Sequence, residues 1–579
     1  FFSLSFSRFS RSNRLFAGIW FGKGKPHFPT FMKPFCQSIR NLYLKGIEIP
    51  KVEHTIKGIL LDTTMDSPAR SSWLNIKQYN GYNGCCTCTE PGEQLDLGPG
   101  KKNARRQCHV YPFNKSFAQT TGHAKFRQHD EVKSQALIAM SQLSERGKVS
   151  KPVEGVLGLS WAFSLPLHDV VSGTAVDYMH CICEGAIDQH LNAWFEDKSG
   201  NQYLGNSVSE VDNALLSIKP ISEITRRPRS LSDWKQWKAN EKRAFLLYYS
   251  LPLLFERLEE QSLLHLAFLV GGVYRLLKDS IPEADLQEAG VFLRLYCAQA
   301  PYFYGERFQT FNIHQVLHLK HTVQNLGPLW SNSCFPFEDY NGDLTGYFHG
   351  SQNIQGQIVK SVCVHQSLPQ LAESMPEGSD AKKLYQSLLS KSYTCRTVGE
   401  QISEEIFVIG SLERVWDTCH SRQSLLTVKE REIIGAASKI WVFGRARING
   451  AEYQSSFYKR TKARNNFTVV YERRGKSLYG SIEKFVKYQE KCTAMSCLNS
   501  RCSCDLPFHY IVLLKKMRKH PSQLPMYKGI EVIKHIRRVI VADNPIAVPF
   551  TCIKAKCMRI EVDTASVYVC HLPNCFEKD

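Results

Sequence analysis

The chain has 579 residues, and its 73 Lys and Arg against 54 Asp and Glu give a formal net charge of +19 at pH 7. Hydrophobic residues make up 43% of the sequence and charged residues 22%. This composition excludes a disordered chain and is typical of a globular protein with about two to four domains. The longest apolar run, Leu263 to Leu277, is interrupted by His265 and Arg275 and is too short to span a bilayer. We therefore predict no membrane segment.

The positive charge is concentrated at the two ends of the sequence. Residues 441–579 contain 25 Lys and Arg against 11 Asp and Glu, and the first sixty residues contain 10 against 2. The middle of the chain is close to neutral. Basic ends around a neutral body predict a polyanionic partner, most simply nucleic acid. The alternative that remains open is an ordinary solvated basic surface.

The 20 cysteines are clustered as C-x-x-C and C-x-C pairs, which favours zinc or free thiols in a reducing compartment over a disulfide scaffold. The opening stretch, FFSLSFSRFSRSNRLF, is rich in Ser, Arg and Phe and lacks acids. A mitochondrial transit peptide has this composition. Because the sequence does not begin with Met, the preferred interpretation is a truncated fragment or an incomplete gene model.

The first 130 residues predict a small α/β unit. Leu15 to Phe21 reads as a buried strand, Phe31 to Leu44 has helical spacing of its apolar residues, and His54 to Asp62 reads as the next strand. Strand, helix and strand in this order are typical of an α/β unit. Residues 90–130 are polar and irregular, so we expect a connecting region there.

The rest of the chain divides into a helical part and a strand-rich part. Apolar residues at three- and four-residue intervals predict a helical body, in which Pro252 should kink or split the first helix. From about residue 440, short alternating segments predict a small, basic β-rich domain. The expected helices are Asp233 to Leu258, Ser262 to Lys278, Asp285 to Gln299 and Asn312 to Leu326 in the body, then Asp380 to Leu389 and Glu400 to Ala437.

Two neighbouring motifs, one at Asp66 and one at Cys85 and Cys88, contain residue types that bind metal ions. The apolar run Ile56 to Leu61 is followed by Asp66 on a Ser-Pro turn, where a carboxylate at a strand end can bind a metal; the alternative is a cap or turn former. Cys85 and Cys88 have the C-x-x-C spacing that grips one side of a tetrahedral zinc. Reduced core cysteines are the alternative. The candidates for the two missing ligands are Cys108, His109, His180, Cys181 and Cys183.

Further candidates follow later in the chain. Asp177 and His180 have the i, i+3 spacing that places both side chains on one helix face, although Asp177 could also cap the helix and His180 could be a buried core residue. Glu338 lies in the aromatic segment FPFEDYNG, where it could be a third carboxylate or a turn acid. A zinc site is also open among the last cysteines, which are Cys492, Cys497, Cys502, Cys504, Cys552, Cys557, Cys570 and Cys575.

The blocks that contain these residues resemble the transposases of CACTA (En/Spm-type) DNA transposons. They are FAGIWFGKGKPHFPTFMKPF, DSPARSSWLNIKQYNGYNGCCTC, GVLGLSWAFSLPLHDVVSGTAVDYMHCICEGAIDQHLNAWF, RRPRSLSDWKQWKANEKRAFLLYYSLPLL and NIHQVLHLKHTVQNLGPLWSNSCFPFEDYNGDL. The resemblance extends over roughly residues 15 to 355, with the blocks in the expected order. The basic C-terminal region is similar to the tail of animal-type transposase-derived proteins of this group.

The resemblance implies an α/β, RNase-H-like core of the DDE/D type, interrupted by a large helical insertion. In such a core, three carboxylates hold two Mg²⁺ ions that activate the attacking oxygen and stabilise the leaving oxygen. By position, Asp66 matches the second acid, and Cys85 with Cys88 matches the structural zinc knuckle. Asp177 and His180 match the accessory D-x-x-H element. Glu338 matches the last acid, with Asp339 and Asp343 left open.

The implied domains are residues 1–90 as a core segment with the zinc knuckle, 91–175 as an irregular linker, 176–330 as the insertion, 331–439 as the return to the core, and 440–579 as the basic domain. The family's first acid lies upstream of the AGIWFGK block, but this sequence has no Asp or Glu before Glu48. The core is therefore expected to be incomplete and inactive in strand transfer.

We accordingly predict a nuclear DNA-binding protein that has no small-molecule substrate, with self-association left open. Magnesium is expected only if the carboxylates are complete, whereas zinc is expected as a structural ion. The alternative is a non-enzymatic, zinc-containing nuclear interaction protein; a zinc hydrolase built on Asp66, Asp177 and His180 is a weaker third possibility. The predicted DNA-binding residues are Arg226, Arg227, Arg229, Arg473 and Arg474.

Overall fold

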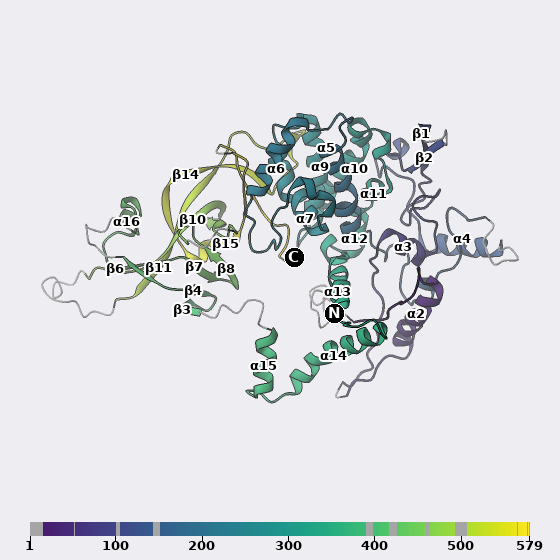
Figure 1. Ribbon diagram of the computed structural model, residues 1–579, viewed down its shortest axis with the longest axis horizontal. Coiled ribbons are helices and arrows are strands. Elements are labelled where there is room, and N and C mark those ends of the chain that lie inside the picture. Colours follow the sequence, from purple (N-terminus) through teal and green to yellow (C-terminus); the bar gives the residue numbers. More distant parts are fainter. Residues whose placement is uncertain are drawn as a thin grey trace.

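The computed structural model describes residues 15–50, 52–99, 105–142, 151–389, 398–415, 425–458, 463–492, 506–563, 565–575 and 577. Within them the chain is a mixed α and β protein, in which a curled sheet lies beside a helical body (Figure 1). The opening stretch that suggested a transit peptide lies almost entirely outside the described residues. Among the helices that the structure describes, none has the length and apolarity needed to cross a bilayer.

The N-terminal segment forms its predicted helix but not its predicted strands. Helix α2 spans Phe28–Leu44, close to the expected range. Residues 15–21 and 54–62 form no strand, and only an isolated bridge joins Ile47 to Ile56. Strands need neighbours for their backbone hydrogen bonds, and no sheet forms among the described residues of this segment. The side chains of Leu15, Ile56, Ile59 and Leu61 consequently remain exposed, and the RNase-H-like core stays a prediction.

The predicted linker of residues 91–175 contains regular elements that pack on the N-terminal segment. Strands β1 (Glu93–Pro99) and β2 (Arg105–Val110) form an antiparallel hairpin, and helix α4 (His129–Ser141) follows. Val156 and Val170 are fully buried in one cluster with Trp73 of the short helix α3 (Ser67–Leu74). This region therefore forms one packed unit with the segment before it.

The predicted helical body is present. Its central pair is α9 (Glu260–Leu276) and α10 (Glu283–Tyr304), near the expected ranges, with Leu266 and Phe268 at 0% exposure. The expected helix 233–258 is broken into short 3-10, α and π pieces, and Pro252 lies in the last of them. The other elements are η5 (Met179–Ala186), α5 (Ile187–Phe195), α6 (Val208–Ser217), η7 (Leu231–Gln236), α7 (Ala239–Ala244), η8 (Phe245–Tyr249), α8 (Ser250–Leu254), α11 (Phe311–Val316) and α12 (Leu319–Leu326).

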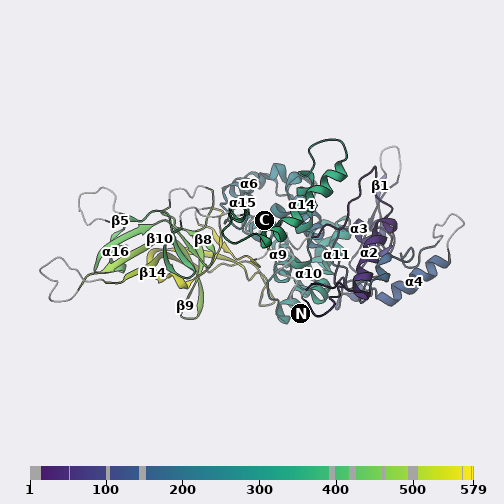
Figure 2. The same cartoon turned by 90° about the horizontal axis from the view of Figure 1, so that it is seen from below.

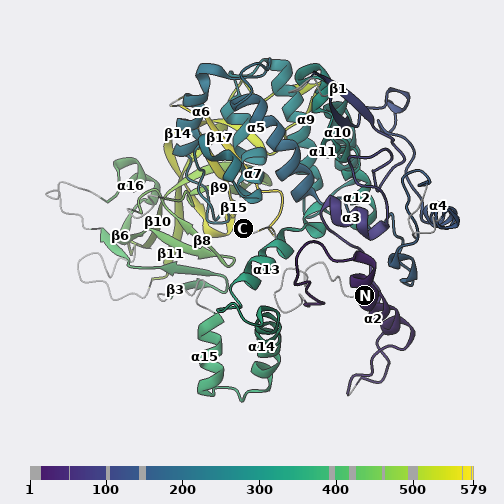
Figure 3. The same cartoon turned by 45° about the vertical axis from the view of Figure 1, so that its right-hand side comes forward.

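Three helices lead from the body towards the sheet. Helix α13 spans Phe335–Thr345, α14 spans Ile354–Ser374, and α15 spans Asp380–Leu389, the last as predicted. Figure 3 shows α14 and α15 below the body and the sheet. Only a few of their side chains are buried, so these helices connect the two parts and contribute little to either core.

The β-rich part begins about forty residues earlier than predicted. The expected helix at 400–437 is wrong: the described residues of this range form β3 (Val398–Ser403), β4 (Ile406–Ile409), β5 (Glu413–Val415) and the short helix α16 (Val428–Ile434). Ile406 and Val408 are buried at alternate positions of β4. Their two-residue period is that of a strand. Glu404 and Glu405, which lie between β3 and β4, made this period hard to recognise in the sequence.

A curled nine-stranded sheet dominates the C-terminal part (Figure 2). Its order is β15-β9-β10-β11-β14-β17-β16, with β6 paired to β10 and β5, while β3-β4-β7-β8 form a second sheet. The remaining bounds are β6 (Ala437–Phe443), β7 (Arg445–Ile448), β8 (Ala451–Gln454), β9 (Thr468–Arg473), β10 (Lys476–Glu490), β11 (Phe508–Lys519), β12 (Met526–Tyr527), β13 (Ile530–Glu531), β14 (Ile536–Pro549), β15 (Ile553–Lys556), β16 (Met558–Glu561) and β17 (Val567–Cys570).

The C-terminal part shares a core with the helical body. Val532 and Tyr568, at 0% and 1% exposure, belong to the same buried cluster as α9. The guanidinium of the buried Arg275 donates to the carbonyl oxygens of Val532 at 2.7 Å and Glu531 at 3.1 Å, and forms an ion pair with Glu288 at 2.9 Å. Buried side chains of residues 440–579 therefore pack in one cluster with those of the helical body.

Buried histidines should make this fold sensitive to acid. Burial lowers the pKa of His265 to about 4 and that of His535 to about 3. Because the folded pKa lies below the usual value near 6.5, the stability that neutral imidazoles provide is complete above that pH and is lost as pH falls towards 3. We expect the free energy of unfolding, measured in urea, to fall by about 1.4 kcal/mol per group and pH unit below 6.5.

The matched variant is His265→Gln, because Gln can keep the hydrogen bond that the His265 Nε2 forms with the carbonyl oxygen of Tyr296 at 2.9 Å. Glutamine does not titrate, so this variant should show a shallower loss of stability between pH 6.5 and 4. The same slope in both proteins would contradict the assignment.

Candidate metal centre and the neighbouring acidic cluster

Two cysteines on a tight loop and two histidines on the helical body meet in the interior. Cys85 and Cys88 follow helix α3 and are both 0% exposed, whereas His314 lies on α11 and His318 directly before α12. Arg127 holds the loop in place, since its Nε donates to the carbonyl oxygens of Cys85 at 2.8 Å and Cys88 at 3.1 Å. These two hydrogen bonds hold the carbonyl groups of the loop in place.

The four donor atoms all lie within 4.8 Å of one another. Cys85 Sγ is 3.4 Å from His318 Nε2, Cys88 Sγ is 3.3 Å from His314 Nε2, and the two Nε2 atoms are 3.1 Å apart. Around a tetrahedral zinc, with bonds of about 2.3 Å to sulfur and 2.0–2.1 Å to nitrogen, sulfur and nitrogen are separated by roughly 3.5 Å. The observed edges fit such an ion.

Protonation in the cluster also favours a cation. Burial lowers the pKa of His318 to about 4, so this imidazole is neutral at pH 7 and can bind a metal. Burial acts to raise the pKa of Cys85, but the hydrogen bond from Cys88 and the two imidazoles bring it well below its usual range. Burial raises the pKa of Cys88. Zinc binds cysteine as thiolate, so a bound metal would release the protons that remain on the pair.

The surroundings of the cluster exclude water. Tyr111 stacks on His314 with ring centroids 5.0 Å apart, and His123 meets His318 edge-on at 4.4 Å. The side chain of Arg70 is 1% exposed, and its Nε and Nη2 have no hydrogen-bond partner among the described residues. The charge of Arg70 acts to lower the pKa of the neighbouring Cys86 and His318. A closed site of this kind suits a structural ion rather than a catalytic one.

Sequence analysis identified half of this ligand set. Cys85 and Cys88 are in the cluster, but the other predicted zinc ligands, Cys108, His109 and Cys183, are not, and His314 and His318 take their place. Cys108 and His109 lie on β2, where the His109 ring contacts Gln94 at 3.2 Å. Cys183 is buried in the π-helix η5, near Arg243 and Glu577. The signal that was missed is N-I-H-Q-V-L-H, whose H-x3-H spacing places both imidazoles on one helix face.

A second cluster forms where three distant segments cross. Thr63 and Thr174 form a parallel bridge, with the Thr63 N–H donating to Gly173 at 2.8 Å. The Thr64 hydroxyl donates to the carbonyl oxygen of Asn332 at 2.9 Å. The chain before Asp66 therefore lies between the segment that leads to Asp177 and the segment that leads to helix α13.

Asp177 is the centre of this cluster. Its Oδ2 accepts a hydrogen bond from His180 Nδ1 at 2.6 Å, and its Oδ1 accepts one from the backbone N–H of Cys334 at 2.9 Å. The backbone N–H groups of Met179 and His180 also donate to this carboxylate. The hydrogen bond to Asp177 raises the pKa of His180. With four donors, Asp177 caps the π-helix and anchors α13, the alternative that the sequence had left open.

The two predicted catalytic carboxylates border this cluster. Asp66 is the N-cap of α3, where its Oδ1 accepts from the Ala69 N–H at 2.7 Å, and its charge helps to raise the pKa of His180. Glu338 is exposed in the first turn of α13, and its charge contributes, after burial and other groups, to the raised pKa of Cys334. Asp177, His180 and Cys334 have ligand atoms within 4.8 Å of one another, and Asp66 and Glu338 are linked to this group only through the effect of their charges on His180 and Cys334.

No protein-family model, no curated protein and no solved structure matches this chain. The site geometry and the motif blocks quoted above are therefore the observations from which a function can be argued. Of the two clusters, the buried Cys and His set has the donor types and spacing of a metal site, whereas the Asp177 cluster is already satisfied by hydrogen bonds.

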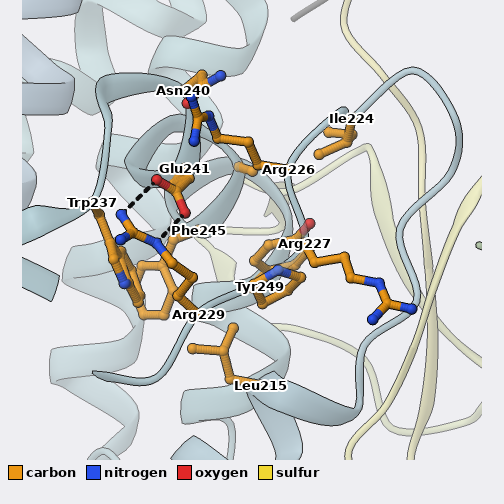
Figure 4. A pocket seen from close by; sticks show the side chains of 12 residues that line it. Leu215, Ile224, Arg226, Arg227, Arg229, Trp237, Asn240, Glu241, Phe245 and Tyr249 are labelled. Carbon is orange, nitrogen blue, oxygen red and sulfur yellow. Dashed lines mark hydrogen bonds and ion pairs between the residues drawn. The ribbon is translucent and has the colours of Figure 1, made fainter. Parts of the chain in front are cut away.

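The predicted DNA-binding arginines near residue 227 differ in their exposure and in their contacts within the fold. Arg229 forms a bidentate ion pair with Glu241, at 2.7 and 2.8 Å, and so holds the turn before α7 (Figure 4). Arg226 and Arg227 are exposed, and Figure 4 shows Arg227 extending away from that pair. Arg229 is thus engaged in the fold, and it is a poor candidate for binding phosphate. Arg473 is exposed at the end of β9.

The C-terminal cysteines supply no second cysteine cluster among the described residues. Cys497, Cys502 and Cys504 lie outside the described part of the chain. Cys557 and Cys570 are both 0% exposed and pack in apolar clusters. Burial raises the pKa of each, so both are neutral thiols.

Proposed function

We propose that this chain is a transposase-derived DNA-binding protein of the CACTA type, acting in the nucleus and stabilised by a structural zinc ion. The proposal is supported by the cluster of Asp177, His180 and Cys334, where the charge of Asp66 acts on His180 and the charge of Glu338 acts on Cys334. Asp66, Asp177 and Glu338 lie in three separate sequence blocks that resemble the transposases. Asp66 and Glu338 are hundreds of residues apart in the sequence. The high positive charge of the chain supports a nucleic-acid partner.

Zinc is the ion that the Cys85, Cys88, His314 and His318 cluster suits best. Two thiolates and two imidazoles in a tetrahedron favour zinc over magnesium or calcium, which prefer oxygen ligands. The ion would tie the loop after α3 to helices α11 and α12. Asp66 and Asp177 depend on the same segments for their positions, so the zinc would also support the acidic cluster.

The acidic cluster is proposed as the remnant of a phosphodiester-cleaving site. Asp66 and Glu338 would hold Mg²⁺, which supplies activation of the attacking oxygen when it is bound. The helix cap uses Oδ1 of Asp66 and leaves its Oδ2 without a hydrogen-bond partner among the described residues. Asp177 orients His180 and fixes the start of α13, which positions Glu338.

DNA binding should depend strongly on salt. A protein that neutralises several phosphates releases counterions, so its affinity falls steeply as salt increases. We expect the affinity for a fluorescent duplex, measured by anisotropy, to fall at least about tenfold between 50 and 200 mM NaCl. Affinity that stays constant over this range would contradict the proposal and favour the alternative of a zinc-containing protein-interaction module.

Cleavage is tested separately from binding. The same duplex is incubated with Mg²⁺ and either the unaltered protein or Asp66→Asn, which keeps the size of the side chain and its ability to cap α3. Mg²⁺-dependent cleavage that disappears in Asp66→Asn would show that the acidic cluster retains its chemistry. Binding without cleavage in both proteins would show that only the DNA-binding function remains.

A further inference from the structure

Three β-hairpins of this protein turn in the same way. Each has a two-residue loop in which both residues have positive φ, as type I′ turns require. The loops are Asn449-Gly450, with φ of 49° and 76°, Arg474-Gly475, with 52° and 70°, and Lys528-Gly529, with 47° and 78°. Asn-Gly is the pair that this turn prefers, because Asn tolerates the left-handed region better than long side chains do. In two of the three turns, a cation occupies the strained position.

The β9–β10 turn presents three cations to solvent. Arg473 and Lys476 are paired across the hairpin, and Arg474 lies between them at the tip. All three residues are exposed, and the described residues offer none of them an ion-pair partner. The neighbouring Glu472 is already paired with Lys554 at 3.5 Å. Figure 2 shows β9 at the lower rim of the sheet, where its end is clear of the helical body.

The Lys528 turn provides an internal comparison. Its ammonium lies 5.4 Å from the ring of Tyr527, and Tyr527 packs edge-on against Phe268 of α9 at 5.1 Å. The Lys528 tip is therefore next to the helical body, and its cation has an aromatic contact within the fold. The Arg474 tip lacks any such contact among the described residues. Residues in strained backbone conformations are concentrated at functional sites.

We propose that the β9–β10 hairpin enters a groove of duplex DNA, with Arg474 at its tip. This inference rests on the proposed DNA binding. A two-stranded ribbon fits the major groove of B-DNA. The planar guanidinium of Arg474 can donate two parallel hydrogen bonds to a phosphate or to a guanine edge. Arg473 and Lys476, one on each strand, would then contact the phosphates at the two sides of the groove.

The Arg474→Asn variant tests the proposed DNA contact of Arg474 without an expected loss of folding stability. Asn suits the left-handed position better than Arg, so the melting temperature should stay the same or rise. The affinity for a duplex at 100 mM NaCl should fall about five- to tenfold, and the slope of log affinity against log salt should decrease by about one. Lys528→Asn removes the same charge from the same type of turn, and its duplex affinity should stay within about twofold of the unaltered protein.

Each outcome has a distinct meaning. If the unaltered protein does not bind duplex DNA, the proposed function itself fails. If the protein binds but Arg474→Asn and Lys528→Asn both retain its affinity, the hairpin assignment is overturned while DNA binding stands. If Arg474→Asn weakens binding to single-stranded RNA and leaves duplex binding unchanged, the partner assigned to the hairpin is wrong. A melting temperature that falls with affinity in Arg474→Asn would indicate a structural role instead.

Discussion

Replacing His314 by Ala is expected to remove the metal ion and to unfold the first half of the protein. A structural zinc contributes its binding free energy to folding, with apparent values of about 10–16 kcal/mol in small zinc-binding peptides. The proposed ion would link the loop of Cys85 and Cys88 to α11 and α12. We expect the zinc content, measured by mass spectrometry of the metal, to fall from about one per chain to near zero. The melting temperature should fall with it.

The control is Cys108→Ser. Sequence analysis had placed Cys108 among the ligands, but this residue lies on β2 and outside the cluster. It is half-buried, so exchanging its sulfur for oxygen should cost little stability. Full zinc content in Cys108→Ser together with loss in His314→Ala supports the Cys85, Cys88, His314 and His318 set. The reverse pattern would overturn it.

Arg275→Met should have the second-largest effect. The guanidinium of Arg275 is 2% exposed and donates to the carbonyl oxygens of Val532 and Glu531, which joins α9 to the C-terminal strands. Its loss leaves those carbonyl oxygens without their buried donor, and removing one partner of a buried charge pair typically costs about 3–5 kcal/mol. Met retains much of the packing volume, so the effect measures lost polar contacts. Urea unfolding should show a reduction of this size.

Arg294→Met is the matched control for that substitution. Arg294 lies on α10 and donates to the carbonyl oxygen of Thr120 at 2.7 Å near the surface. Its replacement should change the free energy of unfolding by only about 0.5 kcal/mol. If Arg275→Met proves equally mild, the helical body and the C-terminal strands are not joined as the structure shows.

Local patterns predicted the helical body well. Helices α9 and α10 have apolar residues at three- and four-residue intervals, and they begin and end within a few residues of the expected positions, except at the C-terminal end of α10. The spacing of Cys85 and Cys88 likewise shows that the two thiols can share an ion. In these cases, the information lies within one turn of helix or one loop, where sequence spacing determines which side chains are close together.

Long-range contacts could not be predicted in this way. His314 is 226 residues from its nearest cysteine ligand, Cys88, and only the packing of α11 brings the two together. The strand expected at 54–62 depends on neighbours that the described residues do not supply. The helix expected at 400–437 was predicted wrongly for a local reason, because Glu400 in β3 and Glu404 and Glu405 between β3 and β4 hide the strand pattern of the apolar residues in β4.

X-ray absorption at the zinc edge of the purified protein would test the central claim most directly. The claim is that one ion joins the loop of Cys85 and Cys88 to the helices of His314 and His318. The account predicts about two sulfur ligands near 2.3 Å and two nitrogen ligands near 2.0–2.1 Å. A spectrum with three or four sulfur ligands, or with oxygen ligands alone, would contradict this assignment and the placement of α11 on which it rests.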